Sequence, residues 1–426
     1  MNILVLGNGF DLALGLPTRY TDFLAFVRDV RGIFSSNLIM RSPGERGHNE
    51  FFGKLLHSDF HRKTRKKVFA KYPAIRNVWR AFHTTDLDVA SVLDDFRFCV
   101  NRNLWIEYFL QQYDNKQMMG ENWIDLEHEV KEVIRRLPSI DAISRAVDGE
   151  TLETTTISKI LAMAQEPSKI GLAKYRAIKK LLRENYERFV MALEIYLDFF
   201  VRKSKKEITV KKGKKQSFFR LPSILQGIKF NAALSFNYTD FFTAIPPLDN
   251  PPVETHFVHG KLIYCDGKRA GRALDEMMKE SNIVLGFDEY LDNGKKNTQL
   301  DFVYYRKYFQ RIAKRTGSRY LNWMGPVQTT AHMDAKERIA METHLRQSPL
   351  HNFHIFGHSM DPTDKEVFKD ILLREPNDTK VTIYYHDEDA HERIITNLIA
   401  IIGQDRLIEK TYARTNAGAE IEIVPQ

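Results

Sequence analysis

Polar residues suited to acid–base chemistry follow short apolar runs in the second half of this sequence. His259 comes after the run 255–258, and Asn237 comes after 230–236. An imidazole titrates near neutral pH, so His259 can act as a general base on water or a hydroxyl group, while the amide of Asn237 can hold a ribose hydroxyl. Cleavage of an N-glycosidic bond needs such groups, because an oxocarbenium-like ribose must be stabilised and water positioned. Further candidates at the ends of such runs are Asp240, His358, Ser359, Asp361 and Asp364.

Each of these residues also has a structural interpretation. A histidine at the end of a strand is often only a hydrogen-bonded neighbour of the site. Asp361 and Asp364 can cap the helix that begins after Pro362. No Gly-x-Ser-x-Gly segment occurs, so a serine hydrolase of the nucleophile-elbow type is not indicated.

A glycine-punctuated turn near the start of the chain is the second feature that suggests a ligand. The apolar run Ile3–Leu6 predicts a buried parallel strand, and Gly7 and Gly9 predict a tight turn into a helix from about Asp11. The amino end of such a helix attracts phosphate, and glycines let a pyrophosphate approach the backbone. The dinucleotide-binding fingerprint would need a third glycine where Leu12 stands, so a turn without a ligand is the alternative.

The elements that must position these residues are short strands alternating with helices. Apolar runs precede polar or glycine residues at 230–236, 255–258, 282–285, 352–356 and 380–385, and helices are expected at 302–317, 335–347 and 365–373. In an open parallel sheet, ligands bind beyond the carboxyl ends of the strands. The strand-end polar residues are therefore expected to share a crevice with Gly7, Gly9, Phe10 and Asp11.

The middle of the chain is predicted to be a large helical insertion. It carries two basic runs, 62–71 and 202–215, and the second predicts a β-hairpin with a basic tip formed by Lys211, Lys212, Lys214 and Lys215. A solvated hairpin is one interpretation, and binding of nucleic acid or an acidic partner is the other. Asp125 and Glu129 lie four residues apart, so they are expected on one face of a helix. They can be metal ligands there, or they can belong to an acidic face exposed to solvent.

The composition of the chain limits its number of domains and the kinds of partner it can have. The chain has 426 residues, of which 43% are hydrophobic, so it can form two or three domains or one large domain with an insertion. The net charge of +8 is compatible with nucleic-acid contact or with solvated surface lysines. Cys99 and Cys265 lack metal or disulfide spacing, so we expect no metal and a cytoplasmic protein. No apolar window has membrane-spanning length, and no membrane partner is expected.

Several motifs together resemble the AbiH family of bacterial abortive-infection proteins. They are the segments 7–12, 15–18 with Tyr20, 123–127, 235–239, 259–260 and 356–364. AbiH in turn is distantly similar to the sirtuin-type NAD-binding fold. The resemblance implies an α/β fold: a sirtuin-like, Rossmann-like parallel sheet with helices on both faces and a large α-helical insertion.

The resemblance also implies a ligand and the residues that hold it. Asn237, His259 and Asp240 become the catalytic candidates, with NAD as substrate or ligand. The implied nucleotide-binding residues are Gly7, Asn8, Gly9, Phe10, Asp11, Pro17, Thr18, Tyr20, Tyr238, Gly357, His358, Ser359, Asp361 and Asp364. The zinc cysteines of sirtuins are missing, which argues against a protein deacylase and leaves NAD hydrolysis during phage defence as the leading hypothesis.

Two alternatives remain beside an NAD glycohydrolase. One is a nucleotide-binding sensor or scaffold that binds nucleic acid or a partner without turnover, and the other is a metal-dependent nuclease. A toxic enzyme must be silent in healthy cells, so restraint by assembly into a homo-oligomer, or by the insertion covering the crevice, is expected. The predicted domains are a nucleotide-binding domain at 1–30 and 224–410, a helical insertion at 31–223 with its basic hairpin near 202–220, and a tail at 411–426.

Overall fold

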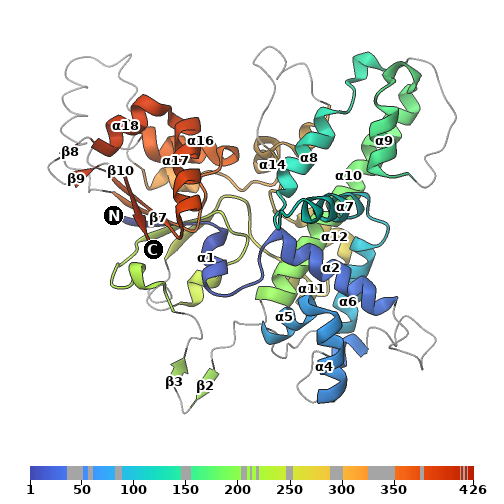
Figure 1. Cartoon of the computed structure of the whole chain (residues 1–426), viewed down its shortest axis with the longest axis horizontal. Helices are drawn as coiled ribbons and strands as arrows, with labels where there is room; N and C mark the ends of the chain where they lie inside the picture. Colours follow the sequence, from blue (N-terminus) through green and yellow to red (C-terminus); the bar gives the residue numbers. More distant parts are fainter. Residues whose placement is uncertain are drawn as a thin grey trace. The chain divides into compact units, whose positions relative to one another are not determined.

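The computed structural model divides into two compact units, which are described separately (Figure 1). The sheet unit comprises Met1–Gly15, Lys211–Gly260 and Thr316–Gln426, and the helical unit comprises Leu16–Val210 and Lys261–Arg315. The structure describes residues 1–35, 51–55, 61–81, 89–144, 155–202, 209–211, 214–216, 220–245, 253–287, 301–324, 351–374, 379–412, 414–415, 418–419 and 421–426. The predicted helix at 335–347 lies outside these residues.

A six-stranded sheet, all of whose strand pairs are parallel, organises the described part of the sheet unit. Its strands are β1 (Asn2–Leu6), β4 (Ala232–Ser235), β5 (Glu254–Phe257), β6 (Asn352–Phe356), β7 (Lys380–Tyr385) and β10 (Ile421–Pro425). Their order across the sheet is β5-β4-β1-β6-β7-β10. Numbered along the chain, this is the order 3-2-1-4-5-6 of doubly wound dinucleotide-binding folds. The α/β prediction with a parallel sheet is confirmed.

The strands form because their apolar residues are covered by helices. The side chains of Ile3 and Val5 in β1 are fully buried in a core that also contains apolar residues of the neighbouring strands. The helices α16 (Lys365–Lys369), α17 (Glu388–Ile402) and α18 (Gln404–Tyr412) contribute to this core, for example through Phe368 and Leu398 (Figure 1). A continuous apolar strand such as β1 is typical of a sheet buried on both faces.

The register of the sheet brings four strand ends to one edge. Leu6 at the end of β1 is paired with Ser235 of β4 and with Phe356 of β6, and Ser235 is paired with Phe257 of β5. Residues that follow these four strands therefore emerge side by side. Strand β4, the next in the chain, lies on one side of β1, and β6 lies on its other side. The connections from the carboxyl ends of the strands therefore run in opposite directions at this point, and α/β proteins bind ligands where this happens.

The helical unit is built around one long helix. Helix α10 (Leu172–Ile195) continues as the π-helix η4 (Tyr196–Arg202), and its aromatic residues pack with those of neighbouring helices, as Phe200 does with Phe26 and Phe96. Further α-helices with bounds in the described part of this unit are α2 (Tyr20–Phe34), α4 (Arg62–Lys71), α5 (Pro73–Ala81), α6 (Val89–Val100), α7 (Leu104–Met118), α8 (Leu126–Arg135), α9 (Ile157–Met163), α11 (Tyr264–Arg269), α12 (Leu274–Glu280) and α14 (Lys307–Ala313).

The helical unit is larger than the predicted insertion, because it includes α2 and the segment Lys261–Arg315. Two buried carboxylates hold that segment. Glu194 accepts hydrogen bonds from the amides of Ile263 and Tyr264 at 2.8 and 3.0 Å, and Asp198 accepts one from the Cys265 amide at 2.9 Å. These bonds satisfy the amino end of α11, so the segment packs with the helices rather than with the sheet. The run 282–285 forms no strand.

The carboxyl-terminal segment also differs from the prediction. Residues 421–425 form the edge strand β10, paired in parallel with β7, where a tail at 411–426 was expected. Two short strands, β8 (Arg414–Thr415) and β9 (Gly418–Ala419), form an antiparallel pair just before it. Where the basic hairpin was predicted, β2 (Thr209–Lys211) and β3 (Lys214–Gln216) form a two-stranded sheet, and Lys212 lies outside the described residues.

Candidate functional site

Two loops at the carboxyl edge of the sheet are joined backbone to backbone. The loop after β1 leads into the short helix α1 (Asn8–Ala13), and the loop after β6 begins at Gly357. The Gly7 amide donates to the Phe356 carbonyl at 3.0 Å, and the Gly9 amide donates to the Gly357 carbonyl at 2.8 Å. These amides are thus engaged within the protein, and the phosphate-binding role of the two glycines stays a prediction.

The glycines are explained by how closely the two loops approach. A Cβ added to Gly7 would lie 2.4 Å from the Gly357 carbonyl oxygen, and one added to Gly357 would lie 2.3 Å from the Phe10 amide nitrogen. Gly357 also has a φ of 70°, in the left-handed region that disfavours a side chain. Glycine is therefore required on both loops by packing alone.

We expect Gly357→Ala to lower the free energy of unfolding by about 3 kcal/mol or more, because backbone strain and a backbone collision add. Gly15→Ala is the matched control, since Gly15 has a φ of 73° and nothing within 4 Å of an added Cβ. That control should cost only about 1 kcal/mol. Chemical denaturation measures both values, and equal losses would contradict the packing of the two loops.

A buried carboxylate lies at the start of α1. Asp11 is 2% exposed; it accepts a hydrogen bond from the Thr239 hydroxyl and is also bonded by the Asn237 side chain. The pKa of Asp11 is raised to about 7, chiefly by burial; the bonds from Thr239 and Asn237 oppose this shift, and the neighbouring Asp240 carboxylate adds to it. Asn237 in addition donates from Nδ2 to the Gly7 carbonyl at 3.0 Å. The loop after β4 thereby meets the loop after β1, and Asp11 can exchange a proton near neutral pH.

A second cluster lies at the same edge and contains two histidines that share one carboxylate. Nε2 of His259 lies 3.1 Å from Oδ1 of Asp364, and Nε2 of His358 lies 3.5 Å from Oδ2. Nδ1 of His358 accepts the Met360 amide at 2.9 Å, so its proton lies on Nε2, toward Asp364. The Phe236 ring packs against both imidazoles, with centroids 5.5 and 4.4 Å away. His259 thus has the carboxylate partner that orients general bases.

The structure brings most of the predicted site residues to the sheet unit. Asn237, Tyr238 and Asp240 follow β4, and His259 follows β5. The others in this unit follow β1 or β6 and are Gly7, Asn8, Gly9, Phe10, Asp11, Gly357, His358, Ser359, Asp361 and Asp364. The structure assigns Pro17, Thr18 and Tyr20 to the helical unit instead.

Several of these residues have a clear structural role. Phe10 is fully buried and packs edge to face against Phe356, with ring centroids 5.9 Å apart. Asp361 caps the turn that follows it by accepting the Thr363 amide at 2.8 Å. The Ser359 carbonyl accepts a bond from Asn397 at 2.8 Å. The side-chain contacts of Phe10 and Asp361 account for these two residues without a ligand, whereas that of Ser359 involves only its backbone.

Thr239 and Phe236 are site residues that sequence reasoning did not select. Thr239 is the donor to Asp11, and the Phe236 ring packs against both imidazoles and stacks on Phe368 at 5.1 Å. Both belong to the segment Ser235–Thr239, so their place beside Asn237 was the available signal.

The two acidic residues considered for a metal have other partners. Asp125 is the amino cap of α8, because its Oδ1 accepts the amides of Glu127 and His128 at 2.9 and 3.1 Å. Glu129 is buried and contacts the Tyr108 hydroxyl at 3.4 Å and Lys116 at 3.9 Å. Across the described ranges, no group of three or more histidine, cysteine or acidic residues could hold a metal ion.

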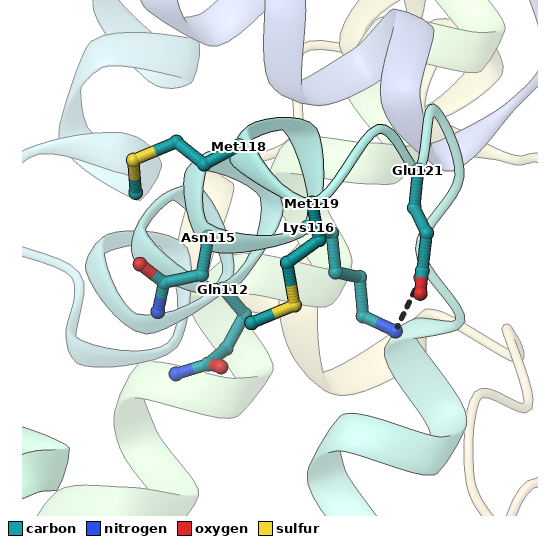
Figure 2. A pocket seen from close by; sticks show the side chains of 6 residues that line it. All are labelled: Gln112, Asn115, Lys116, Met118, Met119 and Glu121. Atoms are coloured by element: carbon teal, nitrogen blue, oxygen red, sulfur yellow. Dashed lines mark ion pairs between the residues drawn. The ribbon is translucent and has the colours of Figure 1, made fainter.

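A hollow of about 390 Å³ lies on the helical unit at the end of α7 (Figure 2). Its lining is Gln112, Asn115, Lys116, Met118, Met119 and Glu121, with Lys116 and Glu121 paired at 3.7 Å. Met118 and Met119 are 80% and 78% exposed and leave the helix in different directions. None of the residues proposed for catalysis lines it.

The sequence model of the family described as bacteriophage abortive infection AbiH matches residues 3–385. The match includes both candidate clusters at the sheet edge. No curated protein and no solved structure matches the chain. Among the helices that the structure describes, none combines the length and the apolar character needed to cross a membrane.

Proposed function

This chain belongs to the bacteriophage abortive-infection AbiH family, and we propose that it serves that role by hydrolysing the N-glycosidic bond of NAD to nicotinamide and ADP-ribose. Family membership implies the abortive-infection role itself. The proposal adds a substrate, a reaction and a sirtuin-like nucleotide site. It makes the chain an effector that depletes a host cofactor on infection.

One observation carries the proposal: His259, held by Asp364 at 3.1 Å, lies at the carboxyl edge of a sheet with the dinucleotide-binding strand order. A histidine oriented by a carboxylate is the usual form of a general base. This edge is where folds with this order bind nucleotides. The support therefore concerns the ribose end of the ligand more than its pyrophosphate, since the Gly7 and Gly9 amides have protein partners.

The proposed reaction needs little from the protein. The nicotinamide ring of NAD is a cation, so it accepts the electron pair of the breaking C–N bond and leaves neutral without a proton donor. The ribose acquires oxocarbenium character, which the carboxylates of Asp11 and Asp240 stabilise electrostatically. His259 takes a proton from the attacking water, whose oxygen forms the new bond to the ribose carbon. Asn237 holds a ribose hydroxyl.

The test is made in bacteria, where the unknown trigger is supplied by infection. Cells carrying the chain are infected with a phage that it restricts, and NAD, nicotinamide and ADP-ribose are followed by mass spectrometry. We expect NAD to fall and both products to rise before lysis, and neither change with His259→Ala. Restriction of the phage with constant NAD would contradict the proposal. A nucleotide that co-purifies intact would then indicate a sensor.

A further inference from the structure

All charged side chains of helix α4 (Arg62–Lys71) of the helical unit are cationic. Its sequence is RKTRKKVFAK, and between positions 61 and 78 every charged side chain is lysine or arginine. Arg62, Lys63, Lys66 and Lys67 are exposed. At 100° per residue, these side chains and that of Lys71 occupy one half of the helix circumference, so α4 displays a continuous basic face.

The opposite face of α4 fixes the helix to the unit. Val68 and Phe69 are 1% and 7% exposed, so the apolar residues point into the protein. Tyr72, just after α4, donates from its hydroxyl to the Gly32 carbonyl at 3.0 Å. Asp29 of α2 then accepts the Ala74 amide at 2.7 Å, at the start of α5. The basic face is therefore held on a packed scaffold and is not an unstructured basic segment.

The cations of this face differ from others on the same unit. In the described part of the chain, no carboxylate forms an ion pair with Lys63, Lys66 or Lys67. Several exposed cations elsewhere on the unit do lie beside acids: Lys169 pairs with Glu166, Lys180 with Glu184 and Arg183 with Glu187. Like charges held together, with no acid paired to them among the described residues, favour a polyanionic ligand.

We propose that the basic face of α4 binds the phosphate backbone of double-stranded nucleic acid without sequence preference. A ten-residue helix is about 15 Å long, a length of duplex that carries about nine phosphate charges. Single strands are bound by stacking on exposed aromatic rings, but Phe69 and Tyr72 are 7% and 5% exposed. Insertion into a membrane would need an exposed apolar face, and that of α4 is buried.

The test measures binding of the full chain to a labelled 30-base-pair duplex of random sequence over a range of salt concentrations. The variant Lys63→Gln/Lys66→Gln/Lys67→Gln removes three cations from the exposed basic face of α4. The control Lys169→Gln/Lys180→Gln/Arg183→Gln removes the same charge from positions that have acidic neighbours. We expect the first variant to bind at least tenfold more weakly, with the slope of log affinity against log salt smaller by about three.

The control should bind within about twofold of the unchanged protein, and thermal melting should show that both variants fold. The proposal is overturned if the unchanged chain does not bind the duplex, or if the two variants lose affinity equally. It is also overturned if the α4 variant keeps its affinity for the duplex and replacement of the hairpin lysines with glutamine lowers that affinity. The hairpin lysines are Lys211, Lys212, Lys214 and Lys215. Binding to phosphatidylserine vesicles or polyglutamate but not to duplex would assign the face to a membrane or an acidic protein instead.

Discussion

His259→Ala should lower nicotinamide release by about 10²- to 10⁴-fold without unfolding the protein, since this range is typical for loss of a general base. The proposed base is oriented by Asp364, whose Oδ1 lies 3.1 Å from Nε2 of His259. Asp364→Asn keeps the shape of the partner but removes its charge, so we expect a smaller decrease of about tenfold or more. The rates are compared as the initial rise of nicotinamide in infected cells that contain equal amounts of each folded variant.

The matched control is His354→Ala, which removes another imidazole from the sheet unit. His354 lies within β6 and contacts the Tyr384 hydroxyl through Nδ1 at 2.9 Å. Its loss should lower stability and leave turnover per folded molecule unchanged. If His354→Ala and His259→Ala reduce turnover equally at matched folded fractions, His259 has no catalytic role.

Asp11→Asn should change the pH dependence of folding strongly. Burial raises the pKa of Asp11 from its ordinary value of 3.8 to about 7, so the folded state binds this proton more tightly than the unfolded state. The resulting stabilisation is complete below pH 3.8 and is lost as the pH rises through 7. A shift of about three units corresponds to about 4 kcal/mol.

The measurement is urea unfolding of both proteins at intervals between pH 4 and pH 8. We expect the free energy of unfolding of Asp11→Asn, relative to the unchanged protein, to rise by up to about 4 kcal/mol across this range. Burial also raises the pKa of Glu194 to about 7, but that group is present in both proteins and cancels in the difference. A difference that does not vary with pH would show that Asp11 is ionised throughout.

The edge of the sheet could be predicted because its signals are local. Each of the runs before Gly7, Asn237, His259 and Gly357 is apolar and ends in polar or glycine residues, which is sufficient to indicate parallel strands with a common carboxyl edge. The contacts between the loops could not be predicted. The raised pKa of Asp11 depends on burial in the folded protein, beside residues remote in sequence such as Thr239. The residues adjacent to Asp11 in the sequence do not indicate this burial.

The division of the chain was harder to predict for a related reason. Glu194 and Asp198 look in the sequence like interruptions of an apolar helix, yet in the structure they bind the amides that begin α11. The pairing is between segments about 70 residues apart, which no periodicity reveals. Strand β10 was missed although Ile421 and Ile423 flank Glu422 in the alternation typical of a strand, because a run of five residues is too short to distinguish an edge strand from a tail.

The contact between the two glycine loops also bears on how relatives of this chain should be compared. A side chain at Gly7, Gly9 or Gly357 would lie under 3.0 Å from the backbone of the opposite loop. The three positions are therefore expected to stay glycine in any homologue that keeps this junction, whether or not it handles a nucleotide. Invariance there would be evidence of shared architecture. Shared chemistry has to be judged from variation at Asp11, His259 and Asp364.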